Sequence, residues 1–231
     1  MKITTNKGFT LAEVLLTLVT IGIVAAITIP LFVQIYKDQV TSAQLKKTFG
    51  ILSQAVRMAE AHNGEIDDWD LGEADTPEGG LKLYNYLVPE LIRYKDCKGE
   101  QGCFADNYLT LQGTAGSYQP SKWNNCARGI LNNGVPFVIW SGGTGGDSPM
   151  GSDIYGMIRV DINGESKPNR YGYDYFGYVI KKQGLIPVGT TSNEVNLYCN
   201  PFGSNAENGI GCTAWVIYKK NFDYKHKNIS W

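Results

Sequence analysis

The chain has 231 residues, of which 43% are hydrophobic and 12% aromatic, so it can bury the core of one modest globular domain and carry a further segment. This hydrophobic content excludes a wholly disordered chain. The formal net charge of -1 provides no broad basic surface for nucleic acid, so we expect no direct nucleic-acid partner. Most of the 27 glycines and 14 tyrosines follow residue 63, which favours short strands joined by turns in that part.

The first predicted element is a membrane-spanning helix. Twenty residues from Val14 to Val33 carry no charge, and as a helix they span about 30 Å, the thickness of the hydrocarbon layer of a bilayer. Lys2 and Lys7 precede this run, which places the first residues in the cytoplasm and the bulk of the chain on the exported side. A cleavable secretory signal is the alternative, but the run is longer than a signal core and no small-x-small cleavage pattern follows it.

One carboxylate, Glu13, stands at the start of this apolar stretch. A carboxylate in the middle of lipid costs on the order of 2.5–3.5 kcal/mol, so it needs a partner. Lys7 lies six residues away, which is the wrong helical spacing. If the chain were cut after Gly8, the new terminal ammonium of Phe9 would lie one helical turn from Glu13, in the same chain or in a neighbouring copy.

The stretch KGFTLAEVLLTLVTIGIVAAITIP, residues 7–30, closely resembles the amino-terminal signature of type IV pilins and of the pseudopilins of type II secretion. In that family a short basic leader ends in glycine, phenylalanine follows, and glutamate is the fifth residue of the mature chain. The resemblance implies that a prepilin peptidase cleaves between Gly8 and Phe9 and methylates the new amino terminus. It also implies that Glu13 pairs with the terminal amine of an adjacent subunit.

The resemblance further implies a structural subunit with no catalytic residues of its own. The expected partners are the prepilin peptidase, copies of the chain and other pilin-like subunits in a helical filament, and an inner-membrane assembly platform with a cytoplasmic motor ATPase. The expected location is the bacterial inner membrane, with one span and a periplasmic head, and then a periplasmic or cell-surface filament. A type II secretion pseudopilus, a type IV pilus and a DNA-uptake filament all remain open. The alternative function is a membrane-tethered periplasmic binding protein or enzyme that acts through its head.

A kink or weak point is expected in the apolar helix between Gly22 and Pro30. Pro30 lacks a backbone N–H, so the carbonyl of Ala26 loses its usual partner. Filaments of the resembled family often lose helicity between the matching glycine and proline, which implies that this segment stretches when it is packed.

Beyond the membrane run, apolar residues recur at spacings of three and four, which predicts an amphipathic helix that packs on a sheet; they are Leu45, Phe49, Leu52, Val56 and Ala59. Asn63 and Gly64 provide a left-handed cap that ends this helix. The predicted organisation is a leader (1–8), one long helix (9–62, with membrane half 9–33 and amphipathic half 34–62) and a head (63–231).

Within the head, residues 79–94 have helical spacing interrupted by Pro89. Strand-like runs follow at 107–113, 135–140, 154–162 and 173–180, with glycine-rich turns expected at 141–151 and 163–172. A long helix followed by a strand meander predicts an α+β fold in which the helix lies on an antiparallel sheet. The pilin resemblance implies the same architecture.

Five cysteines lie on the exported side of the predicted span, where disulfides are permitted. The favoured bridges are Cys97 with Cys103 and Cys199 with Cys212, each of which closes a glycine-bearing loop, and this choice leaves Cys126 over. Cys103 with Cys126 is the competing pair. A structural zinc site is not expected because the chain has only two histidines. The bridge from Cys199 to Cys212 is similar to the disulfide that closes the carboxy-terminal loop of many type IV pilins.

A turn between two predicted strands carries four oxygen-bearing side chains, Asp161, Asn163, Glu165 and Asp174. Such ligands suit calcium, so this loop is a candidate for one structural calcium ion, although no cofactor is required. An EF-hand is excluded because the glycine comes two positions too early and no glutamate stands at the twelfth position. The resembled pseudopilins carry a calcium ion near their carboxy terminus. The alternative is a plain turn in which Asp161 and Asn163 cap their own backbone.

Overall fold

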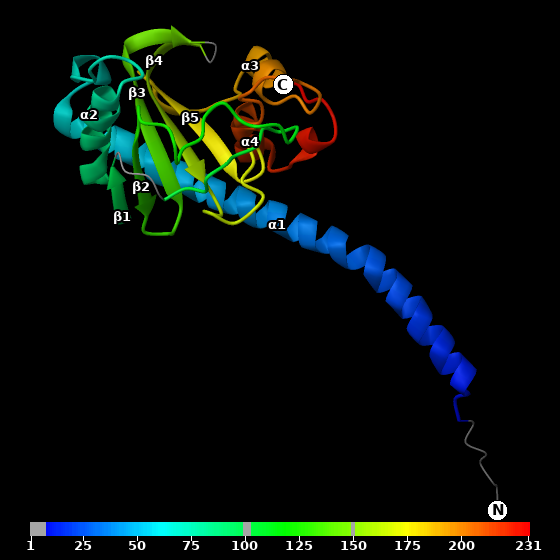
Figure 1. Ribbon diagram of the computed structural model, residues 1–231. Helices are drawn as coiled ribbons and strands as arrows, with labels where there is room; N and C mark the ends of the chain where they lie inside the picture. Colours follow the sequence, from blue (N-terminus) through cyan, green and yellow to red (C-terminus); the bar gives the residue numbers. More distant parts are fainter. Residues whose placement is uncertain (1–7, 99–102, 149–150) are drawn as a thin grey trace, which may run out of the picture. The chain divides into compact units, whose positions relative to one another are not determined.

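The computed structural model describes residues 8–98, 103–148 and 151–231 (Figure 1). They form two units, one that ends at Val40 and one that comprises Thr41–Trp231. The second unit contains the sheet and the buried core and corresponds to the predicted head, together with the last part of the long helix.

Helix α1 comprises Leu11–Asn63 and continues without interruption past Gly22 and Pro30. It begins two residues later than predicted, because Thr10 caps its first turn. It ends at Asn63, one residue later than the predicted end at 62, and the predicted cap follows: Gly64 has a φ of 86°, and its amide donates to the carbonyl of Glu60 at 2.9 Å. The kink or weak point expected between Gly22 and Pro30 stays a prediction, and so does the loss of helicity expected there in a packed filament.

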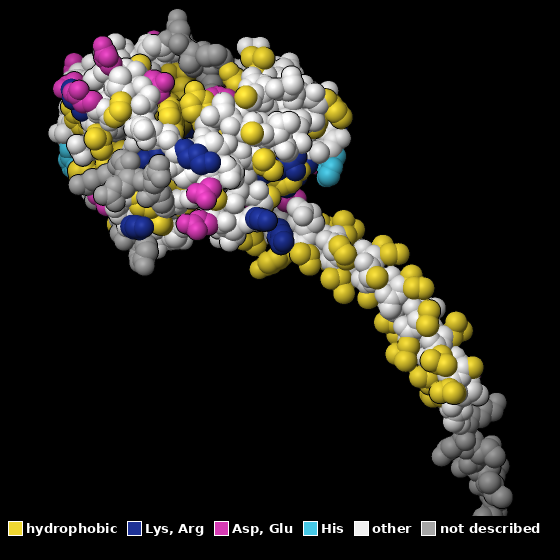
Figure 2. Space-filling model, in the orientation of Figure 1, with side chains coloured by type: hydrophobic (Ala, Val, Ile, Leu, Met, Phe, Trp, Pro, Cys, Tyr) yellow, Lys and Arg dark blue, Asp and Glu magenta, His cyan; other side chains and the backbone are white. Residues whose placement is uncertain are grey.

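The first part of α1 exposes apolar side chains on every face. Leu16, Ile27 and Phe32, for example, are 66%, 71% and 68% exposed. Figure 2 shows hydrophobic side chains along this part of the helix. A window of 18 residues within α1 has a mean hydropathy of 2.5, so the helix is long and apolar enough to cross a membrane.

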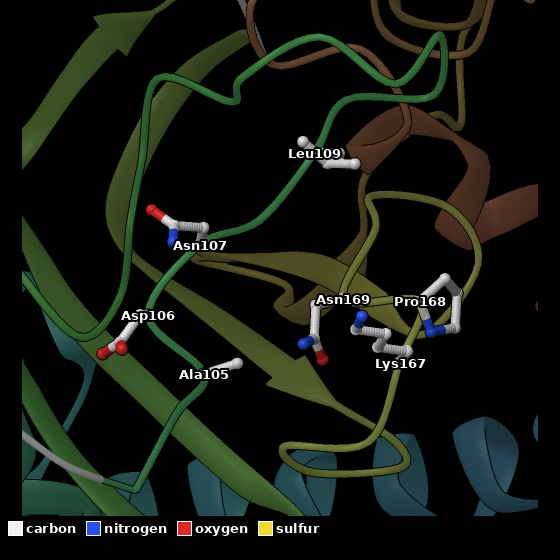
Figure 3. A pocket seen from close by; sticks show the side chains of 7 residues that line it. All are labelled: Ala105, Asp106, Asn107, Leu109, Lys167, Pro168 and Asn169. Atoms are coloured by element: carbon white, nitrogen blue, oxygen red, sulfur yellow. The ribbon is translucent and has the colours of Figure 1, made fainter.

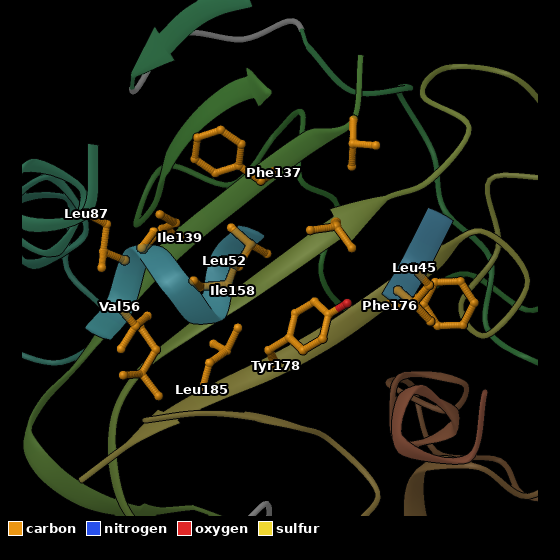
Figure 4. Close-up of a cluster of buried hydrophobic side chains, with 14 of the residues drawn as sticks. Leu45, Leu52, Val56, Leu87, Phe137, Ile139, Ile158, Phe176, Tyr178 and Leu185 are labelled. Atoms are coloured by element: carbon orange, nitrogen blue, oxygen red, sulfur yellow. The ribbon is translucent and has the colours of Figure 1, made fainter. Parts of the chain in front are cut away.

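The second part of α1 buries one stripe in the core of the head (Figure 4). Leu45, Leu52, Val56 and Ala59 are at most 1% exposed, and Phe49 packs partly buried beside them. These are the positions that the spacing of three and four predicts.

A short helix follows as expected. Helix α2 (Pro77–Leu87) begins with Thr76 as its N-cap, whose hydroxyl accepts from the amide of Gly79 at 3.1 Å, and with proline in its first turn. A 3-10 turn at Val88–Glu90 contains Pro89 and ends the helix, so the predicted break is confirmed. A second 3-10 turn, Ile66–Asp68, lies between α1 and α2.

Six antiparallel strands form one sheet in which every strand pairs with the next in the chain. They are β1 (Arg93–Lys98), β2 (Ala127–Leu131), β3 (Pro136–Ser148), β4 (Gly151–Asp161), β5 (Tyr175–Lys181) and β6 (Gly184–Pro187). The helix on an antiparallel sheet is the predicted α+β layout and is consistent with a pilin-like architecture (Figure 1).

Two expectations about the strands were wrong. Residues 107–113 form no strand but only isolated bridges at Leu109, because their backbone groups bond to distant loops: the amide of Leu109 donates to Asn169 and that of Leu111 to Asn208. The glycine-rich stretch that was expected as a turn instead extends β3 as far as Ser148. Gly142 makes this pairing feasible, since a Cβ there would lie 2.2 Å from the carbonyl oxygen of Ile154.

Both faces of the sheet are buried. On the α1 face the strands contribute Phe137, Ile139, Ile158, Val160 and Tyr178 to the core of Figure 4. On the other face a second cluster includes Val138, Trp140, Tyr175 and Val179, and it is covered by the connection from residue 103 to 126 and by part of the carboxy-terminal region. That region holds helices α3 (Ser192–Tyr198) and α4 (Thr213–Lys219) and the 3-10 turns Ile210–Cys212 and Asp223–Lys225.

Candidate functional site

The predicted processing point lies directly before α1. Gly8 and Phe9 precede the helix, and no described atom lies within 4 Å of where a Cβ on Gly8 would stand. The side chain of Phe9 is 89% exposed. A peptidase that needs to reach the bond between Gly8 and Phe9 therefore meets no obstruction from the described part of the chain.

Glu13 takes part in a capping box with Thr10. The backbone N–H and the hydroxyl of Thr10 each donate to Glu13 Oε2 at 2.8 Å, and the amide of Glu13 lies 3.3 Å from Thr10 Oγ1. A threonine followed three residues later by glutamate is the usual pattern of this motif, in which two otherwise unpaired amides of the first turn find acceptors. The letters TLAE at the start of the apolar run carry this signal, which the sequence analysis did not use.

The capping box provides Glu13 with partners inside its own chain. Its carboxylate also lies at the positive end of the helix dipole. Phe9 is the residue immediately before Thr10, so an ammonium created there by cleavage would be close in sequence to the same carboxylate. Glu13 therefore has a local structural role that does not depend on assembly, and this role leaves the predicted pairing with a neighbour's amine untested.

The cysteines pair as favoured from the sequence. Cys97 bonds to Cys103 and Cys199 to Cys212, while Cys126 is a free, buried thiol. Burial raises the pKa of the Cys126 thiol to about 11, which makes it a poor nucleophile near neutral pH.

The predicted calcium loop brings two of its four side chains together. Asp161 is fully buried at the end of β4, and Asp174 is 3% exposed just before β5. Each carboxylate is engaged inside the chain. Asp174 accepts from the amides of Asn169 and Arg170 at 2.7 and 2.6 Å, while Asp161 accepts from the hydroxyl of Tyr108 and from the amide of Asn163 at 3.2 Å.

The other two predicted ligands are exposed, although the side chain of Asn163 also hydrogen-bonds to Asp174. The side chain of Asn163 is exposed and donates to the carbonyl of Lys167 at 3.3 Å, and Glu165 is exposed. Within residues 8–98, 103–148 and 151–231, no three His, Cys, Asp or Glu side chains are grouped so as to hold a metal ion. The bonds of Asp161 and Asp174 are those of a turn that caps its own backbone, and calcium binding stays a prediction.

Burial makes the Asp161 and Asp174 pair costly to ionise. Burial, and secondarily the charge of Asp174, raises the pKa of Asp161 to about 8, while burial raises the pKa of Asp174 to about 6. A bound cation would oppose both shifts, because it favours the ionised form of each carboxylate.

A hollow of about 310 Å³ opens beside this loop (Figure 3). One wall is the segment from Ala105 to Leu109 and the other is the turn from Lys167 to Asn169. The lining is mixed, since Asp106 and Lys167 contribute opposite charges and Leu109 and Pro168 contribute apolar surface. Its volume is at the lower end of the range for small-molecule sites.

A buried arginine on the second face of the sheet was not anticipated. The guanidinium of Arg159 lies 4.6 Å from the ring centre of Tyr118 and 4.8 Å from that of Trp140, and its Nη2 is 3.4 Å from Glu207. It is 1% exposed, and neither Nη has a hydrogen-bond partner within the described part of the chain. This cation stabilises the contact between the sheet and the segments that cover it. Its strand reads IRVD, which gives no signal that the arginine points inward.

Comparison with known proteins adds one match. Residues 31–85 match the model of a family of unknown function, DUF6613, which covers the end of the apolar run, the rest of α1 and most of α2. The match begins after residue 30 and does not overlap the pilin-like stretch. No curated protein and no solved structure matches the chain.

Proposed function

We propose that this chain is a structural subunit of the prepilin type. A prepilin peptidase cleaves it between Gly8 and Phe9 and methylates Phe9. The product resides in the bacterial inner membrane with its head in the periplasm, and an assembly platform with a motor ATPase moves it into a pilus or a secretion pseudopilus. The observation that carries the proposal is the stretch 7–30, in which an accessible Gly-Phe bond precedes an apolar helix with one carboxylate at Glu13.

The exposure of α1 supports this proposal. Its large apolar side chains before residue 37 are exposed in the single chain, and burying apolar surface stabilises by roughly 25 cal/mol per Å². A bilayer supplies such burial for the single subunit, and a bundle of equivalent helices supplies it in a filament. The same apolar side chains are therefore covered in both places.

Glu13 adds specificity to such a bundle. In a dry filament core an unpaired carboxylate is costly, so the axial register that places Glu13 beside the Phe9 ammonium of a neighbour is favoured over all others. The capping box holds the carboxylate at the helix start, close to where such an ammonium arrives.

A second candidate function is a membrane-tethered periplasmic binding protein or enzyme. The hollow between Ala105–Leu109 and Lys167–Asn169 favours this alternative, because a hollow of this size could admit a small ligand. The subunit that we propose needs no cofactor. Calcium, if bound, would occupy the loop of Asp161, Asn163, Glu165 and Asp174.

The decisive experiment is the intact mass of the membrane-extracted protein after co-expression with a prepilin peptidase. We expect loss of residues 1–8 and a gain of about 14 Da for one methyl group. The matched control is Gly8→Leu, which alters the cleavage position without disturbing packing, since no described atom adjoins Gly8. It should retain its leader. An unprocessed wild-type chain would favour the tethered alternative.

A further inference from the structure

The carboxy-terminal part of the head is basic in a chain that is slightly acidic overall. Residues 213–231 contain four lysines and one aspartate, a net charge of +3, whereas the whole chain carries -1. Lys227 pairs with Asp223 at 2.8 Å, but Lys219 and Lys220 form no ion pair with any acidic side chain in the described residues. Their charge is available to a partner outside the chain.

Aromatic rings lie beside these lysines. Trp231 and Tyr218 are 42% and 54% exposed, and their ring centres are 6.1 Å apart. The indole N–H of Trp231 donates to the carbonyl of Gly189 at 2.8 Å, which holds the ring in place. The ammonium of Lys219 is 5.4 Å from the ring centre of Trp231. We call the exposed group Tyr218, Lys219, Lys220 and Trp231 the basic aromatic surface.

This surface is tethered close to the end of the apolar run. Helix α4, which carries Tyr218 and Lys219, contacts the first turns of the head part of α1, where Ser42 Oγ lies 3.5 Å from the carbonyl of Val216. Ser42 is nine positions after Val33, and nine such steps span at most about 32 Å when the chain is fully extended. A short segment therefore joins the part of the head that carries α4 to residues 14–33, which the proposed function places in the membrane.

We propose that the basic aromatic surface binds the headgroups of anionic phospholipids and rests the head on the bilayer. The inference depends on the membrane insertion in the proposed function. Tryptophan and tyrosine favour the headgroup level, where the ring meets apolar chains and its polar atom meets water. Lysines near a bilayer are attracted to anionic lipids, and the short tether keeps their effective concentration high.

The tryptophans provide a direct test. All five lie at or after Trp69, so no emission comes from the membrane helix, and Trp69 and Trp140 are at most 5% exposed. The full chain is reconstituted in phosphatidylcholine vesicles that contain brominated phosphatidylglycerol, whose bromines quench indole at close range. We expect quenching, and we expect most of it to be lost in Trp231→Phe.

Matched lysine variants distinguish an effect of the basic aromatic surface from an effect of the total charge of the head. Lys219→Gln with Lys220→Gln should reduce quenching, while Lys95→Gln with Lys122→Gln, two exposed lysines elsewhere on the head, should leave it unchanged. Raising the salt from about 0.1 M to about 1 M shortens the Debye length from about 10 Å to about 3 Å and should also reduce quenching. An unchanged emission maximum in detergent shows that the variants are folded.

Vesicle flotation distinguishes the two possible failures. If the chain floats with the vesicles but is not quenched, or is quenched equally when the bromines are on phosphatidylcholine in vesicles without anionic lipid, the lipid-binding inference is wrong and the membrane insertion stands. If the chain does not float with the vesicles, the membrane-inserted subunit is wrong and the inference fails with it.

Discussion

Helix α1 contains two stretches whose apolar side chains have different surroundings. From Val14 to Val33 the helix is apolar on every face, and its large apolar side chains are exposed in the single chain. From Thr41 onward it is amphipathic, and its apolar stripe is buried against the sheet. One backbone conformation thus serves two environments, and the side-chain pattern alone determines which.

The difference shows where each stretch obtains its stability. The second stretch finds its partners within residues 41–231, so it is stable in a single copy of the chain. The first stretch must find them outside the chain, in lipid or in other helices. Changes in the two stretches should therefore affect different measurements.

The largest expected effect is in the buried stripe. Leu52→Ala removes a side chain that is 1% exposed and should lower the free energy of unfolding of the head by about 2–5 kcal/mol. Leu18→Ala, in the exposed stretch, is the matched control, since that side chain is 61% exposed and lies outside the unit Thr41–Trp231. Denaturant unfolding in detergent, followed by tryptophan emission, measures both. Equal losses would mean that the two stretches are not independent.

The carboxy-terminal disulfide should come next. Replacing Cys199 and Cys212 together by serine releases a loop of 13 residues and should lower the free energy of unfolding by about 3 kcal/mol. Cys126→Ala is the control, because it removes a buried thiol and no cross-link. The same unfolding assay applies, and membrane insertion of α1 should be unchanged. If Cys126 proves to be cross-linked in peptide maps of the wild type, the pairing itself is wrong.

The buried acid pair predicts a pH dependence of the head alone. The pKa of Asp161 is raised to about 8 in the folded chain, so stability that is present at low pH is lost as the pH rises through about 8. The loss should be on the order of 1 kcal/mol per pH unit between about pH 5 and pH 8, and Asp161→Asn should flatten it.

Adding calcium to the same pH experiment tests whether the loop binds this ion. If the loop binds calcium, millimolar calcium should restore the melting temperature of the wild type at pH 8 and have no such effect on Asp161→Asn. If calcium changes neither, the plain turn that caps its own backbone is the correct interpretation of Asp161, Asn163, Glu165 and Asp174.

Substitutions at the start of α1 should have the smallest effect on stability. One of them should nevertheless strongly reduce filament assembly. Glu13→Gln retains an acceptor for the capping box but removes the charge, whereas Thr10→Ala breaks the box and keeps the charge. Thr10→Ala should cost about 1 kcal/mol at the first turn, detected as faster amide exchange there. Glu13→Gln should insert into membranes normally but assemble poorly, as measured by the yield of sheared filaments. If Glu13→Gln assembles normally and Thr10→Ala assembles poorly, Glu13 acts only as a capping residue.

The elements that local pattern specifies were predictable. The stripe from Leu45 to Ala59 and the cap at Gly64 follow from spacing and from backbone freedom, and the strand-like runs at 135–140, 154–162 and 173–180 lie in or overlap β3, β4 and β5. Helix α3 carried a usable signal that was overlooked: Thr191 and Glu194 form a capping box written as TSNE.

Features that depend on contacts between distant parts of the chain could not be predicted from the sequence pattern. Residues 107–113 alternate like a strand, but their partners are loops far away in the chain, so only the tertiary fold decides their state. The inward position of Arg159 follows from the register of β4 and from two aromatic rings on other segments. Gly142 reads as a loop residue until the close approach of the neighbouring strand is known.

The continuous course of α1 has a mechanical consequence. The helix that bears the apolar stretch also supplies the central rod of the head's core, from Leu45 to Ala59. A force applied to the first residues and directed along the helix therefore acts on all the packed side chains of this row at once. It does not separate them from the sheet one after another. A load shared among many contacts is hard to break, which would suit the extraction from a membrane that the proposed function requires.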